Sequence, residues 1–140
     1  MGMEGLGRRF NVVPIAAGTL ISVKDCAGVE FIVTGNDTFT LASAATYNGS
    51  TTPLAAITHY FTCTSTAGAA AWVEATQAAA STVVIASGAA AFYVDCADLP
   101  ANAQYLKVSV AASGLVFAIT HGLLTERLPS LLRQLSGSAS

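Results

Sequence analysis

The chain has 140 residues, of which 53% are hydrophobic and only 10% are charged, and its formal net charge is −2. This length fits a single domain, and the absence of a basic stripe excludes nucleic-acid binding through a phosphate footprint. A surface so poor in charge is typical of a protein covered by partner subunits, because interface cores are depleted in Lys, Glu and Asp, although an ordinary small domain with a weakly charged surface remains the alternative.

Residues 1–9, MGMEGLGRR, contain no apolar stretch and no periodicity, which predicts a flexible N-terminal arm and no signal peptide. The alanine-rich runs are interrupted well short of 18 residues, so we expect no transmembrane helix and a cytoplasmic chain. Cys26, Cys63 and Cys96 are odd in number and lack CxxC spacing, which argues against a disulfide framework or a zinc site. They are expected to be small buried hydrophobes.

From residue 10 onward, short runs rich in β-forming residues alternate with turn signals. Their spacing of 8–12 residues predicts an all-β fold, an antiparallel β-sandwich or barrel-like domain of about eight to ten short strands over residues 10–121. The expected strands are Phe10–Pro14, Thr19–Lys24, Val29–Thr34, Thr38–Leu41, Ile57–Thr64, Ala71–Thr76, Ser81–Ala86, Ala91–Asp95, Tyr105–Ala111 and Leu115–Thr120.

Three of these segments carry more detailed expectations. Strict alternation over 57–64 places Ile57, His59, Phe61 and Cys63 on one face of a strand. Alanine favours helix over residues 67–71 and 75–80, but neither stretch holds a 3.6-residue apolar period, so strands are favoured. A helical turn is expected within residues 95–103, capped by Asp98.

Residues 122–140 are rich in leucine and are expected to form a C-terminal docking segment with a loose tail. Pro129 excludes a continuous helix through this region and instead begins a short one over 129–135. The leucines cover either their own core or a neighbouring subunit, and the pattern leaves both open. The candidate assembly contacts at the two ends of the chain are Arg8, Arg9, Phe10, Leu123, Leu124, Leu128, Leu131, Leu132 and Leu135.

The supply of reactive groups is thin. His59 and His121 do not have the spacing of metal ligands. A catalytic Cys63–His121 pair could form only if the fold brought the two residues together, and the sequence favours this pair over no other. Asp95 and Asp98 are near each other, but capping or turn formation explains them better than paired acid catalysis. We therefore expect a non-enzymatic protein without catalytic, cofactor or metal sites.

Three segments together resemble small structural proteins of tailed bacteriophages, of the kind that decorates or cements a capsid. They are VVPIAAGTLISVKDCAGVEFIVTGNDTFTL (12–41), FYVDCADLPANAQYLKVSV (92–110) and VFAITHGLLTERLPSLL (116–132). The resemblance implies a multi-copy virion protein on the outer capsid surface that binds the major capsid protein and copies of itself. It also implies assembly in the bacterial cytoplasm, terminal segments that make contacts between subunits, and no cofactor, nucleic acid or membrane partner.

Two other functions remain open. The first is a tail tube or connector subunit of the same kind of particle. The second is a carbohydrate-binding or adhesin domain, which exposed aromatic residues would mark, with Trp72, Tyr47, Tyr60 and Tyr105 as candidates. Trp72 is more simply explained as a core or interface residue, because tryptophan is usually mostly buried.

Overall fold

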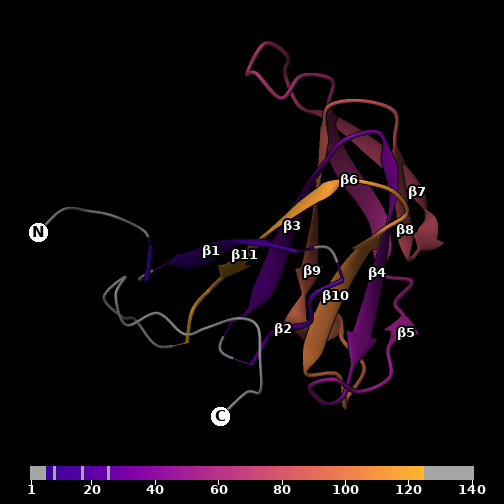
Figure 1. Ribbon diagram of the computed structural model, residues 1–140. Coiled ribbons are helices and arrows are strands. Elements are labelled where there is room, and N and C mark those ends of the chain that lie inside the picture. Colours follow the sequence, from indigo (N-terminus) through magenta and orange to yellow (C-terminus); the bar gives the residue numbers. More distant parts are fainter. Residues whose placement is uncertain (1–5, 8, 17, 25, 125–140) are drawn as a thin grey trace, which may run out of the picture.

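The computed structural model describes residues 6–7, 9–16, 18–24 and 26–124, and these form an all-β fold of two antiparallel sheets (Figure 1). The expected all-β class with antiparallel strands is confirmed, and the described residues form eleven strands rather than eight to ten. In chain order the elements are β1 (Phe10–Ile15), β2 (Ile21–Ser22), β3 (Gly28–Thr34), β4 (Asp37–Ala44), β5 (Thr52–Pro53), β6 (Ile57–Cys63), β7 (Val73–Ala80), β8 (Thr82–Ile85), β9 (Ala89–Asp95), the 3₁₀ turn η1 (Cys96–Asp98), β10 (Tyr105–Val110) and β11 (Leu115–His121).

The strands divide into a six-stranded sheet, in the order β1-β11-β3-β9-β6-β7, and a five-stranded sheet. In the second sheet the order is β2-β10-β4-β5, and β8 pairs with the other end of the same β4 edge. Among the described residues no ladder joins one sheet to the other, so these strands do not close into one barrel. The first strand of the fold, β1, pairs only with the last, β11.

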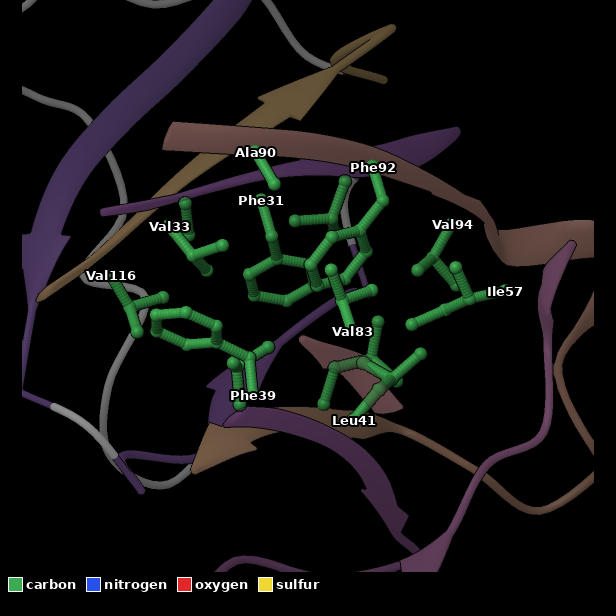
Figure 2. Packing of buried hydrophobic residues seen from close by; sticks show 14 of the residues in the cluster. Phe31, Val33, Phe39, Leu41, Ile57, Val83, Ala90, Phe92, Val94 and Val116 are labelled. Atoms are coloured by element: carbon green, nitrogen blue, oxygen red, sulfur yellow. The ribbon is translucent and has the colours of Figure 1, made fainter. Parts of the chain in front are cut away.

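A single hydrophobic core fills the space between the sheets, because strand alternation directs every second side chain inward. Phe31 of β3 stacks on Phe92 of β9 with ring centroids 5.5 Å apart. Figure 2 shows these rings facing Phe39, Leu41 and Val83 of the smaller sheet. All five side chains are at most 2% exposed.

Asp37 forms hydrogen bonds that link the β3–β4 and β10–β11 connections, both of which cross from one sheet to the other. It follows the two-residue β3–β4 turn, where Gly35 adopts a φ of +111° that other residues rarely tolerate. Its carboxylate accepts N–H groups from Thr38 at 2.8 Å, from Ala112 at 3.0 Å and from Gly114 at 2.8 Å, and also one from the loop residue Ala111. The β10–β11 connection is thereby held against the start of β4.

The expected single face of the 57–64 strand is only partly correct. The pairing of β6 with β7 shifts register between Ile57 and His59, so Ile57 turns into the core while His59 and Phe61 point outward. Cys63 is buried, and its thiol lies within hydrogen-bond distance of the carbonyl oxygens of Ser65 and Ala70 in the following loop. A β-bulge of this kind has no marker in the residue types of the segment.

The second alanine-rich stretch, residues 75–80, is strand, as favoured, and belongs to β7. The strand expected for the first stretch, residues 67–71, is wrong, because these residues lie in the β6–β7 loop and form neither strand nor helix. The helical turn is also present, but as the shorter η1, and its cap differs from the expected one. Asp95 caps it by accepting the Ala97 N–H at 2.9 Å, whereas Asp98 is its last residue. Asp95 takes this role because it ends β9 with extended backbone angles, as an N-cap residue does.

The described part of residues 1–9 does not support an extended arm. Leu6 forms an isolated bridge with Phe10, the Gly7 N–H donates to the Phe10 carbonyl at 2.8 Å, and Arg9 accepts from Gly122. These residues therefore turn back on the start of β1. The expected helix over 129–135 lies outside the described residues.

Candidate functional site

An apolar row crosses the outer face of the six-stranded sheet. Register places Phe117 of β11 opposite Ile32 of β3, and Ile32 in turn opposite Ala91 of β9. Ala91 lies opposite Phe61 of β6, which completes the row. We call Phe117, Ile32, Ala91 and Phe61 the outer row. Cross-strand neighbours on one face lie about 5 Å apart, so the four side chains form a continuous apolar strip.

Further apolar side chains widen this strip on the same face. Val12 of β1 lies opposite Ile119 of β11 and is 38% exposed, while Tyr93 of β9 is 46% exposed. Phe61 is 41% exposed, in contrast to the completely buried Phe31 on the inner face. Contiguous exposed apolar area is a common feature of protein–protein contact surfaces.

Carboxylates border the outer row. Glu74 of β7 lies directly opposite Phe61, and Glu30 precedes Ile32 by two residues on the same face of β3. An apolar centre with a polar rim is the usual arrangement of a protein–protein interface. This surface was not among the sequence-based candidates, since Phe117, Ile32 and Phe61 belong to three strands whose order the sequence does not reveal.

Beside the outer row, β7 forms one edge of the sheet. Most of its eight residues are exposed, and the strand contains no proline and a single charged residue, Glu74. Such an edge offers unpaired backbone groups to another chain, because proline and clustered charge are the usual means of blocking it. The β6–β7 loop projects beyond the sheets (Figure 1) and ends at Trp72, which is 49% exposed.

Glu30 lies in a mixed environment between β11 and β9, opposite Ile119 and Tyr93. Desolvation raises the pKa of its carboxyl, and the positive charge of nearby His121 opposes this in part. The Tyr93 ring packs 6.1 Å from the His121 ring and covers Gly28, where a side chain would collide with it. The pKa of Tyr93 is also raised, chiefly by desolvation.

Glu30→Gln is expected to stabilise the protein at pH 7, by no more than about 1 kcal/mol because the carboxyl is only partly buried. The raised pKa means that the ionised carboxylate opposes folding above that pKa. As the pH falls through the raised pKa of Glu30 towards the ordinary value of 4.5, the carboxylate becomes protonated and this destabilisation is lost. The wild type and Glu30→Gln are then expected to be equally stable. Urea unfolding at pH 7 and pH 4 measures this. A loss of stability at pH 7 would mean that the attraction to His121 outweighs desolvation.

The structure separates the sequence-based assembly candidates. Arg9 is exposed, Phe10 is half-buried at the start of β1, and Leu124 is 72% exposed. Leu123 packs against the core of its own chain and so does not need a neighbouring subunit to cover it. The remaining candidates lie outside the described residues: Arg8, Leu128, Leu131, Leu132 and Leu135.

The aromatic candidates for sugar binding do not form one platform. Tyr105 is buried and contacts Tyr47 at a ring distance of 6.3 Å, and Tyr60 is half-buried against the core. Trp72 and Tyr47 are exposed, but they belong to the β6–β7 and β4–β5 loops respectively. The exposure of Trp72 therefore excludes the core explanation for this residue.

The residues considered for chemistry are dispersed. Cys63 pairs with Ala89 at the start of β9, whereas His121 lies in the row of Asp95 at its end, about 20 Å away along the strand. His59 contacts Thr58 and the edge of the Phe61 ring. Within the described ranges, no three His, Cys, Asp or Glu side chains are grouped to hold a metal ion.

The described part of the chain also contains no helix long and apolar enough to cross a membrane. Comparisons with protein-family models, with curated proteins and with solved structures found no match for this chain.

Proposed function

We propose that this protein is a structural subunit that acts by packing the outer face of its six-stranded sheet against neighbouring protein subunits. The observation that carries the proposal is the outer row, an apolar strip across four strands whose member Phe61 is 41% exposed. Exposed apolar area of this kind costs free energy in water, and contact with another protein recovers it at about 25 cal/mol per Å² buried.

The low charge of the chain supports the same function. Charged residues make up 10% of the sequence, against about 25% in typical soluble domains. Glu30 and Glu74 border the outer row rather than interrupt it. A surface with this distribution is suited to repeated contacts in an assembly, where many weak interfaces add through avidity.

We further propose that the assembly is the particle of a tailed bacteriophage and that the protein decorates or cements the capsid as a multi-copy β-sandwich. The resemblance of residues 12–41, 92–110 and 116–132 to such virion proteins supports this assignment. Its partners would then be the major capsid protein and copies of itself, with the C-terminal leucines as additional contacts. A tail tube or connector subunit is the alternative location in the same particle.

Phe61→Asp tests the role of the outer row. The substitution places a charge on the most exposed side chain of the outer row, and we expect it to weaken self-association or capsid binding about tenfold to hundredfold. Its effect on folding is expected to be small because the side chain is already 41% exposed. Sedimentation velocity over a micromolar concentration series measures self-association, and thermal unfolding measures the folded state.

Val84→Asp is the matched control, because Val84 is 66% exposed but lies on β8 in the smaller sheet. Because Val84 lies outside the proposed interface, we expect Val84→Asp to self-associate as strongly as the wild type. Equal association of all three proteins would contradict the proposed interface.

The location in the particle is tested by co-sedimentation with empty heads and with isolated tails of the phage whose genome encodes the chain. Binding to heads that is lost in Phe61→Asp supports the capsid assignment. Binding along tails supports the alternative, and a monomer that binds neither would contradict both assignments.

A further inference from the structure

Two cysteine thiols meet at one end of the six-stranded sheet, although 70 positions separate them in the chain. The Sγ atoms of Cys26 and Cys96 are 3.9 Å apart, and both lie near the carbonyl oxygen of Val23. Cys26 is buried, with 7% of its surface exposed, whereas Cys96 is half-buried. The pair thus has one accessible member and one protected member.

The backbone fixes this approach. Gly28 and Asp95 form the last pair of the β3–β9 ladder, and the Cys96 N–H donates to the Ala27 carbonyl at 2.9 Å just beyond it. Each cysteine therefore lies within two residues of a paired position. A disulfide needs Cβ atoms about 3.5–4.5 Å apart and sulfur atoms at about 2.05 Å. Thiols already in van der Waals contact, on segments joined by a hydrogen bond, need side-chain rotation rather than a rearrangement of the strands.

We propose that Cys26 and Cys96 form an oxidisable pair that closes to an intramolecular disulfide by exchange with a small disulfide such as oxidised glutathione. The Cys96 thiolate attacks one sulfur of the small disulfide, which releases one glutathione and leaves a mixed disulfide on Cys96. The Cys26 thiol then loses its proton and attacks the Cys96 sulfur, which expels the second glutathione. Two protein thiols become one disulfide, and the small disulfide becomes two thiols.

The electrostatics of the pair suit this order of events. A hydrogen bond with the Cys26 thiol lowers the pKa of Cys96, although desolvation and the charge of Asp95 oppose the shift. A lowered pKa increases the thiolate fraction, and the thiolate is the attacking species. The more exposed cysteine is therefore also the one whose pKa is lowered.

The test counts thiols. The reduced protein is incubated with oxidised glutathione, unfolded, and labelled with a maleimide that carries a polyethylene glycol chain, which gives one gel shift for each remaining thiol. We expect the wild type to fall from three labels to one and Cys63→Ser from two to none. The oxidised protein should also melt about 5–10 °C higher than the reduced protein, because the bond closes a long loop.

Single substitutions separate the two steps. Cys26→Ser is expected to stop at the mixed disulfide, with one glutathione on Cys96 detected by mass spectrometry. Cys96→Ser is expected to react slowly, because its remaining member of the pair is buried. Cys63→Ser is the matched control that keeps the pair. Three labels on the wild type after oxidation and unfolding would overturn the proposal, and so would an oxidised Cys63→Ser variant that keeps both of its labels.

Discussion

Phe31→Ala is expected to lower the free energy of unfolding by about 3–5 kcal/mol. Phe31 is completely buried and stacks on Phe92, so the substitution removes apolar contacts and leaves a cavity between the two sheets. Small domains are stable by only about 5–15 kcal/mol, so this one change removes a large share of the total. Urea unfolding followed by tryptophan fluorescence and by circular dichroism measures the loss.

Phe61→Ala is the control for this experiment, because it removes the same atoms from the outer face of the same sheet. Its expected cost is below about 1 kcal/mol, since the side chain is 41% exposed. Equal losses in the two variants would contradict the assignment of inner and outer faces.

Asp37→Asn is expected to give the largest loss of stability among the polar substitutions considered, with a melting temperature lower by several degrees. The carboxylate accepts N–H groups on both oxygens, from Ala112 and Gly114 among others. The amide nitrogen of asparagine donates rather than accepts, so one orientation of the new side chain removes the acceptor of the Gly114 N–H and the other removes the side-chain acceptor of the Thr38 N–H. The measurement is thermal unfolding at pH 7.

The same substitution should also change the pH dependence of stability. Hydrogen bonds from backbone N–H groups hold the pKa of Asp37 below its ordinary value of 3.8, and the bond from Gly114 contributes most. The stabilisation is therefore complete above pH 3.8 and is lost as the pH falls further, towards the lowered pKa of the folded state. Asp37→Asn should lack this loss, while Asp98→Asn, at the exposed end of η1, should retain it. An unchanged acid transition in Asp37→Asn would contradict the role of the carboxylate.

Local alternation in the sequence was sufficient to predict several strands. Val29–Thr34 and Leu115–Thr120 differ from β3 and β11 by one residue each, because their alternating apolar residues face a real core. Residues 75–80 were ambiguous, because alanine tolerates strand as well as helix and only pairing with β6 decides between them.

Contacts between distant segments were not predictable from the same patterns. The contacts of Asp37 could not be predicted, since its partners at residues 111–114 lie more than 70 positions away. Cys26 and Cys96 were interpreted as separate buried hydrophobes for the same reason. The outer row was missed because it depends on strand order, which follows from pairing and not from the composition of any one strand.

The pairing of β1 with β11 has a consequence for biosynthesis. β1 leaves the ribosome first but has no strand partner until residues 115–121 have been made. β11 also lies between β1 and β3, so every truncated chain that ends before it exposes the edge of β3 as well. Native pairing of the larger sheet is therefore completed only after residues 115–121 have been translated, and nascent or prematurely terminated chains that lack them are the forms most prone to aggregate.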